Sequence, residues 1–207
     1  IKDYFNYNIY DNQILISIIA GKSIDQIQYY LPQFKNIIRV MPNIAVNINK
    51  GTSIWYPSNN ITNNQKNITK NILQILGDEI EVSDEDYIDM GTAISGTGPA
   101  YIFLLTESLI DSAVHLGFSR AVAEKIVLST ITGSSFLANE KIKINNDNIS
   151  NIRYDVTSPG GATANAVYEL EKGSFRTVIN NSVWSAYRKT MELGGKDSRV
   201  GPGRNKY

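Results

Sequence analysis

The sequence predicts an α/β portion followed by an all-α portion, and the spacing of its apolar residues carries this prediction. Over residues 1–82, short β-branched runs alternate with segments whose apolar residues recur at helical spacing. From Ser83 onward the spacing is helical and no strand is predicted. The chain has 207 residues, 42% of them hydrophobic, which is enough for a substantial core.

Four short strands are predicted in the first portion. Most are rich in β-branched residues, and the first two end near Gly21 and at Pro42. Because helical segments alternate with them, we expect an α/β layer with parallel pairing. The predicted strands are residues 14–19, 37–41, 52–56 and 79–82.

Two helices are predicted between these strands, each after a hydroxyl residue that can cap the first turn. One begins after Ser23 and is closed by Pro32, and the other begins after Thr62. The residues expected on their apolar faces are Ile24, Ile27 and Leu31 in the first helix, and Ile68, Ile72, Ile75 and Leu76 in the second.

The second portion is predicted to be a series of long helices. One begins at Gly98-Pro99 and ends at Gly117, because proline is well tolerated in the first helical turn. Ser119 caps the next, which runs toward Asn139; both helices are apolar on more than one face, so a second subunit is expected to cover them. Further helices are predicted over residues 163–172 and 175–193, and residues 194–207 are expected to form a loose tail.

Composition excludes several classes of protein. Twenty basic residues balance twenty acidic ones, so the chain carries no broad charge that would suit nucleic acid. There is no cysteine and one histidine, which leaves no thiolate site and no multi-histidine metal site. The apolar run at residues 14–20 is too short for a bilayer, so no membrane partner is expected, and the composition favours the cytoplasm.

Two other motifs are set aside. The sequence Gly21-Lys22-Ser23 lacks the earlier glycine of a phosphate-binding loop. The acidic run at residues 78–89 lacks the spacing of a calcium loop, and we expect its carboxylates to be solvated.

Two glycine-rich segments, at residues 92–101 and 158–163, directly precede predicted helices. The N-terminus of a helix offers unpaired N–H donors, and glycine lets an anion approach the backbone, so the second segment suits a small carboxylate or phosphate. The alternative is that both segments are helix caps with tight turns, and spacing alone favours that alternative.

Taken together, four segments resemble pyrroline-5-carboxylate reductase in their order and spacing. They read IIRVMPN, TAISGTGPAY, DVTSPGGAT and LEKGSFR, at residues 37–43, 92–101, 155–163 and 170–176. The resemblance extends over about residues 14–193, nearly the whole chain.

The resemblance implies NADPH- or NADH-dependent reduction of 1-pyrroline-5-carboxylate to L-proline, the last step of proline biosynthesis. It implies the C-terminal part of a Rossmann dinucleotide-binding domain at residues 1–82 and a helical substrate-binding and dimerisation domain at residues 83–193. Residues 194–207 are left as a flexible tail. A homodimer or higher homo-oligomer is implied, because subunits of this family exchange helices to build the site.

Matching positions assign the site residues that the resemblance implies. Thr92 corresponds to the threonine whose hydroxyl meets the imine nitrogen, and is expected to be catalytic. Residues expected to bind substrate are Glu85, Ser158, Gly160, Gly161, Ala162 and Thr163. Residues expected near the cofactor are Ala20, Gly21, Asn43 and Asp155, and no metal site is implied.

One departure from the family is the absence of the G-x-G-x-x-G turn that holds the dinucleotide pyrophosphate. The first Rossmann strands are missing as well, so we expect the sequence to be a piece of a longer enzyme. Alternatives are a non-catalytic helical dimerisation module and, with less support, a reductase of another imine or keto acid. A second departure is Ile44-Ala45, where the family commonly has threonine-proline.

Overall fold

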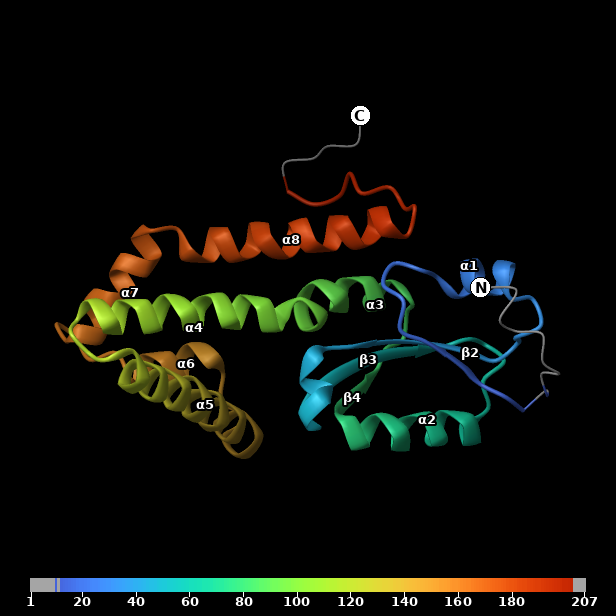
Figure 1. Cartoon of the computed structure of the whole chain (residues 1–207), viewed down its shortest axis with the longest axis horizontal. Helices are drawn as coiled ribbons and strands as arrows, with labels where there is room; N and C mark the ends of the chain where they lie inside the picture. Colours follow the sequence, from blue (N-terminus) through green and yellow to red (C-terminus); the bar gives the residue numbers. More distant parts are fainter. Residues whose placement is uncertain (1–9, 11, 203–207) are drawn as a thin grey trace. The chain divides into compact units, whose positions relative to one another are not determined.

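The structure is a computed structural model that describes residue 10 and residues 12–202. The chain divides into two units (Figure 1). Unit 1 comprises Ile1–Pro99 and Asn181–Tyr207, and unit 2 comprises Ala100–Asn180. The division expected after residue 82 therefore lies within unit 1, which also contains the described part of the expected tail.

Unit 1 contains a four-stranded sheet in the order β1-β2-β3-β4. All four predicted strands are present, as β1 (Leu15–Ser17), β2 (Ile37–Pro42), β3 (Gly51–Pro57) and β4 (Gly77–Glu81). The expectation of parallel pairing is correct for β1–β2 and β3–β4 but wrong for β2–β3, which are antiparallel. Only the short 3₁₀ helix η2 (Ile44–Ile48) joins β2 to β3, and it is too short for the crossover that parallel strands require.

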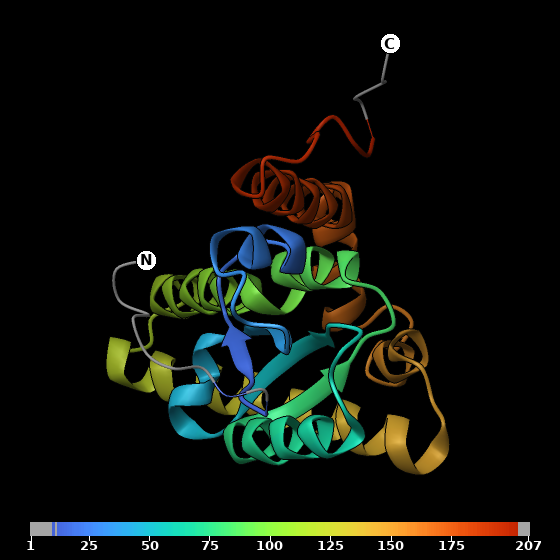
Figure 2. The same ribbon diagram turned by 90° about the vertical axis from the view of Figure 1, so that its right-hand side faces the viewer.

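Helices cover both faces of this sheet, with α1 (Ile24–Tyr30) on one side and α2 (Asn63–Leu76) on the other (Figure 2). Both begin as predicted, and both carry a capping box. The Ser23 hydroxyl accepts from the Gln26 N–H, and the Thr62 hydroxyl accepts from the Gln65 N–H. These reciprocal bonds satisfy N–H groups that the first helical turn leaves open.

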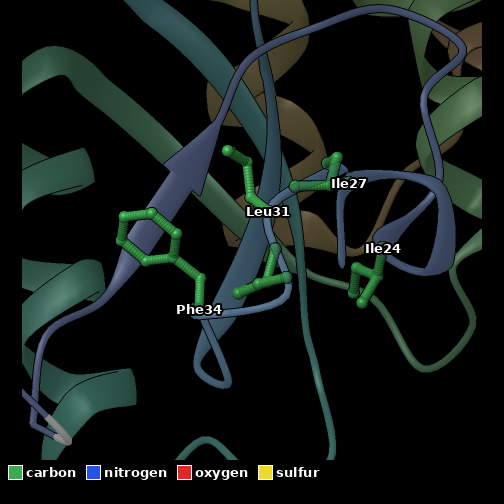
Figure 3. Packing of buried hydrophobic residues seen from close by; sticks show 5 residues of the cluster. Ile24, Ile27, Leu31 and Phe34 are labelled. Atoms are coloured by element: carbon green, nitrogen blue, oxygen red, sulfur yellow. The ribbon is translucent and has the colours of Figure 1, made fainter. Parts of the chain in front are cut away.

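Alternate residues of β2 point into two separate hydrophobic clusters. Ile24 and Ile27 of α1 form one cluster with Leu31 and Phe34 of the segment after it (Figure 3). Ile37 of β2 belongs to the same cluster. Ile38 and Val40 point to the other side and pack with Trp55 and with Leu73 of α2. This period of two is what a strand buried on both faces requires.

The buried face of α2 differs from the predicted one, and of the four residues predicted for it only Leu76 packs against the core. Leu73 is buried, whereas Ile68, Ile72 and Ile75 are exposed, with 69% of Ile75 accessible. Gln65 and Thr69 share the buried face with Leu73 because hydrogen bonds satisfy them: Gln65 Nε2 donates to the Asn12 carbonyl, and the Thr69 hydroxyl donates to the Gln65 carbonyl. A polar residue can be buried at small cost once it is paired.

Beyond β4 the described chain is helical, as predicted. The short helix α3 (Asp86–Gly91) and the π-helix η3 (Thr92–Gly96) were not predicted; α4 (Gly98–His115) begins at the predicted residue. Unit 2 also holds α5 (Arg120–Asn145), which extends beyond the predicted end, and α6 (Ile149–Asp155), which was not predicted. The helices α7 (Ala162–Lys172) and α8 (Phe175–Leu193) lie where expected, and α8 passes from unit 2 into unit 1.

Large apolar side chains on α4 and α5 are exposed, including Phe103, Leu104 and Phe136. Among the described helices, α5 alone is long and apolar enough to cross a membrane by length and composition. A helix covered by a second subunit has the same character, and this was the expectation for α4 and α5.

Candidate active site

The expected site residues fall into two groups, one in each unit. Unit 1 holds those from the first portion of the chain, together with the expected catalytic hydroxyl: Ala20, Gly21, Asn43, Glu85 and Thr92. Unit 2 holds Asp155, Ser158, Gly160, Gly161, Ala162 and Thr163. Each group is described within its own unit.

In unit 1, the expected cofactor residues follow the carboxyl ends of two parallel strands. Ala20 and Gly21 lie in the loop after β1, and Asn43 directly follows β2. In open α/β sheets, ligands bind outside the carboxyl ends of parallel strands. The loop after β1 also exposes Ile18 and Ile19.

Gly21 adopts a backbone conformation that favours glycine, with φ of +75°. A Cβ atom at this position would lie 2.6 Å from the Thr190 carbonyl oxygen and 2.8 Å from the Gly194 nitrogen. The Gln26 side chain, from the helix that follows the loop, donates to the Gly194 carbonyl at 2.8 Å. The loop after β1 is therefore held against the end of α8 by close backbone packing.

Asn43 fixes the turn that follows β2. Its Oδ1 accepts from the backbone N–H of Ala45 at 3.2 Å and of Thr52 at 3.3 Å. The side-chain amide NH₂ group has no partner within the described residues, so it is available as a donor.

The carboxylate of Glu85 already has two partners inside unit 1. Its Oε1 accepts from the Ile24 N–H at 2.7 Å and from NH1 of Arg39 at 2.8 Å. Glu85 thus joins α1, β2 and the start of α3, and its expected contact with substrate stays a prediction.

Arg39 belongs to an ionic network that the sequence did not predict. Its NH2 lies 2.8 Å from Oδ1 of Asp89, and both side chains are 1% exposed. The other oxygen of Asp89 accepts from Lys196 at 2.8 Å, and Lys196 also binds Asp86 at 2.8 Å. Burial lowers the pKa of Lys196, but hydrogen bonds to Asp86 and Asp89 outweigh it, and the net pKa is raised.

The expectation of a wholly solvated acidic run is therefore wrong for Asp89. Its burial is possible because two cations balance its charge. One signal for this was present in the sequence: Arg39 stands inside an otherwise apolar strand, where a charge needs a partner. Nothing local identified Lys196, which lies at the start of the expected flexible tail and pairs with Asp86 and Asp89.

Thr92 is the first residue of the π-helix η3 and is half-buried. Its hydroxyl donates to the Ile88 carbonyl at 2.8 Å, and its own carbonyl accepts from the N–H and hydroxyl of Thr97 at 2.9 and 3.0 Å. With its hydrogen committed to Ile88, the Thr92 oxygen retains lone pairs that can accept another hydrogen bond. π-Helical turns often occur at functional sites.

In unit 2, the turn before α7 leaves its first N–H groups open. Gly161 is the N-cap, and as a glycine it has no side chain that could cap the first turn. The N–H groups of Ala162, Thr163 and Ala164 have no acceptor in the described part of the chain. Gly160 has φ of +71°, with open space where a Cβ would lie. The hydroxyls of Ser158 and Thr163 also make no hydrogen bond within the described residues.

Asp155 ends α6 and is exposed. Its Oδ2 pairs with Nζ of Lys141 from α5, and this hydrogen bond raises the pKa of Lys141. Asp155 thus joins two helices of unit 2, and its expected place near the cofactor stays a prediction.

Comparison with known proteins identifies relatives of one kind. Residues 85–193 match the family described as pyrroline-5-carboxylate reductase dimerisation. The pyrroline-5-carboxylate reductase of Synechocystis is 38% identical over 183 residues, covering 88% of this chain and 66% of the relative. The enzyme of the same name from Arabidopsis thaliana is 35% identical over 182 residues, covering 88% of this chain and 64% of the relative.

Comparison with solved structures identifies relatives of the same kind. The crystal structure of Plasmodium falciparum pyrroline carboxylate reductase with NADP bound has a TM-score of 0.81 and 35% identity, covering 88% of this chain and 68% of that one. The Coxiella burnetii pyrroline-5-carboxylate reductase has the same TM-score of 0.81 at 32% identity, covering 93% of this chain and 68% of that one. The chain spans slightly less than two thirds of the two curated relatives, and it belongs to the pyrroline-5-carboxylate reductase family.

Proposed function

We propose that this chain is part of an enzyme that reduces 1-pyrroline-5-carboxylate to L-proline with NADPH or NADH, and that the reaction takes place in the cytoplasm. The observation that carries this proposal is the open N-terminus of α7. Three N–H groups and two hydroxyls there lack partners within the described residues, in a segment that matches the family.

The substrate carboxylate is the group that suits the turn before α7. The N–H groups of Ala162 and Thr163 donate to its oxygens, and the positive end of the helix dipole favours its negative charge. Gly160 and Gly161 keep the approach free of side chains. The Ser158 hydroxyl supplies a further donor.

The imine nitrogen suits the oxygen of Thr92. Because the Thr92 hydrogen is held by the Ile88 carbonyl, the oxygen accepts from the N–H of a protonated imine rather than donating to a neutral one. A protonated imine carbon is strongly electrophilic. Hydride addition then forms a C–H bond while the C=N π electrons become the nitrogen lone pair, so the product is the neutral amine.

Thr163 is the competing candidate for this contact. Its hydroxyl has no partner within the described residues, so it can donate or accept. Its place in the first turn of α7 puts it beside the proposed carboxylate site. The variants Thr92→Val and Thr163→Val therefore distinguish the two candidates. The variant that loses turnover identifies the threonine that contacts the imine, and the variant that loses substrate affinity identifies the one at the carboxylate site.

The bound nicotinamide supplies the hydride, and the protein orients it. Residues at the carboxyl ends of β1 and β2 fit the nicotinamide end of the cofactor: Ala20 and Gly21 leave the backbone accessible, and Asn43 offers an amide donor. We propose that Asp155 and Glu85 lie at the edge of the site. Each acts there through its ion pair, Asp155 with Lys141 and Glu85 with Arg39.

We further propose that the enzyme is a homodimer or a higher homo-oligomer. The match to a dimerisation family covers the helices that expose Phe103 and Phe136. Burying such side chains in a subunit interface is favourable by about 25 cal/mol per Å² of apolar surface.

The test is nucleotide oxidation with 1-pyrroline-5-carboxylate, measured on the chain as given and on the complete product of its gene. We expect turnover that Thr163→Val impairs mainly by raising KM for the imino acid, because the carboxylate site is disturbed. Thr177→Val, at an exposed position of α8, is the matched control. Lack of turnover with either nucleotide, together with unchanged NADPH fluorescence, would instead support a non-catalytic dimerisation module.

A further inference from the structure

We propose that the segment from Gly194 to Lys196 is a positioning element of the candidate site in unit 1. At one end it holds the loop after β1, and at the other it holds α3, which Thr92 directly follows. It thereby sets the separation of the loop and Thr92. This inference rests on the proposed function, because those two segments are the ones assigned to the cofactor and to the imine.

The contact with α3 is ionic. Nζ of Lys196 lies 2.8 Å from Oδ1 of Asp86 and 2.8 Å from Oδ2 of Asp89, on successive turns of the same short helix. The Lys196 side chain is 30% exposed, whereas Asp89 is 1% exposed. A buried carboxylate that loses one of its cations is left undercompensated, which favours movement of the helix that carries it.

A short chain of bonds leads from this contact to Thr92. Asp89 is also held by Arg39 from β2 at 2.8 Å, so the ion pairs fix α3 against the sheet from two directions. The residue before Asp89, Ile88, is 1% exposed, and its carbonyl accepts the Thr92 hydroxyl at 2.8 Å. Displacement of α3 therefore displaces the Thr92 oxygen with it.

The contact with the loop after β1 is made by backbone atoms. Gly194 lies against Gly21 so closely that a Cβ on Gly21 would come within 2.8 Å of the Gly194 nitrogen. Gln26 Nε2 donates to the Gly194 carbonyl at 2.8 Å, which ties the helix after the loop to the same residue. Gly194 and Lys196 are two residues apart, so the two contacts share one short stretch of backbone.

The neighbouring Lys189 does not share this arrangement. Lys189 pairs with Glu192 three residues away at 3.2 Å, on the surface of α8. Such an exposed pair contributes little to stability and connects no separate elements. Lys196, by contrast, pairs with Asp86 and Asp89, which lie 110 and 107 positions away in the sequence.

The experiment compares Lys196→Met, Lys196→Arg and Lys189→Met in the complete product of the gene. Hydrogen–deuterium exchange over residues 86–97 reports how firmly α3 and η3 are held, through the protection of their backbone amides, without reference to activity. We expect faster exchange in Lys196→Met, wild-type exchange in Lys189→Met, and substantial recovery in Lys196→Arg, whose guanidinium can still reach two carboxylates.

The kinetic measurement uses cofactor deuterated at the transferred hydrogen. Because a misplaced acceptor slows hydride transfer, we expect kcat of Lys196→Met to fall by roughly ten-fold, with KM for the imino acid unchanged and a larger isotope effect on kcat. Simple loss of folded enzyme would lower kcat and leave the isotope effect as it was. Asp86→Asn, which removes one exposed partner, is the milder second variant should Lys196→Met fold poorly.

Unchanged exchange over residues 86–97 in folded Lys196→Met would overturn the proposal, and so would an unchanged isotope effect in an active enzyme. A wild-type protein without reductase activity whose residues 86–97 still respond to Lys196→Met would refute the proposed function and leave the mechanical coupling supported. The two failures are therefore distinguishable.

Discussion

The hydroxyl of Thr92 donates to the carbonyl oxygen of Ile88, four residues earlier, at 2.8 Å. This bond fixes the side-chain rotamer and commits the only hydrogen of the hydroxyl. The oxygen is thereby prepared to accept a hydrogen bond, which suits a protonated imine better than a neutral one. If Thr92 contacts the imine as proposed, this hydrogen bond determines which protonation state of the substrate its hydroxyl can recognise.

Replacing Thr92 with valine removes this acceptor while keeping the shape of the side chain. We expect kcat to fall by about 10²-fold, a typical contribution of a well-placed hydrogen-bonding group in catalysis. Thr92→Ser should keep most of the activity, because serine can make the same bond to Ile88. Thr106→Val is the matched control, since Thr106 donates to the Ile102 carbonyl in the same way at 2.7 Å. Equal losses for the valine variants at positions 92 and 106 would contradict the assignment.

The approach of Gly21 to α8 predicts a large penalty for any side chain at that position. In Gly21→Ala the Cβ would meet the Thr190 carbonyl at 2.6 Å, in addition to the strain of a positive φ. We expect a loss of about 2–4 kcal/mol in the free energy of unfolding, measured with urea.

Gly195→Ala is the control for that measurement, because Gly195 has a similar φ of +71° and no atom within 4 Å of a built Cβ. Its cost should be that of strain alone, about 1–2 kcal/mol. If the two variants are equally stable, the close packing of Gly21 is not a constraint on the fold.

Local signals in the sequence account for the parts of the fold that were predicted. Ser23 and Thr62 mark the starts of α1 and α2 because each makes a capping box with a glutamine three residues later. Pairing and burial depend on the whole fold, and these predictions were only partly correct: two of the three strand pairs are parallel as expected, and the apolar face of α1 is buried as expected. The antiparallel β2–β3 pair follows from a short connection, and the burial of Asp89 follows from a lysine 107 residues away.

The candidate site shows the same division. The glycine-rich segment at residues 158–163 does precede α7, as expected from local features, but spacing alone favoured a capped turn there over an open N-terminus. The roles of Glu85 and Asp155 as ion-pair partners could not be read, since Arg39 and Lys141 are 46 and 14 residues away. Side-chain partners of this kind are fixed by tertiary packing.

The corrected face of α2 gives a second stability prediction. Leu73 is 4% exposed and packs against the sheet, so Leu73→Ala should lower the free energy of unfolding by about 2–4 kcal/mol. Ile72, its neighbour in sequence, is 45% exposed, and Ile72→Ala should cost less than about 1 kcal/mol. The periodicity of the apolar residues alone predicts the reverse order. Urea denaturation of the two variants decides between the structure and that pattern.

Alkaline pH should destabilise unit 1 through two neighbouring groups. Burial and the charges of Asp86 and Asp89 raise the pKa of Tyr187, while Lys196 opposes this shift. The pKa of Lys196 is also raised, because its hydrogen bonds to Asp86 and Asp89 outweigh the effect of burial. In both cases the folded protein holds the proton more tightly than the unfolded chain. The stabilisation is complete below the unfolded pKa values, about 10 for tyrosine and about 10.4 for lysine, and is lost as pH rises through the folded values.

The free energy of unfolding should therefore fall above about pH 10, by at most about 1.4 kcal/mol per pH unit for each group. The double variant Tyr187→Phe/Lys196→Met should show a shallower fall, because it removes both titrations. Lys189→Met, which removes an exposed lysine from the surface of α8, controls for the general effect of titrating lysines. Urea unfolding at a series of alkaline pH values measures the three slopes. Identical slopes for the wild type and the double variant would show that these groups do not hold their protons more tightly in the folded state.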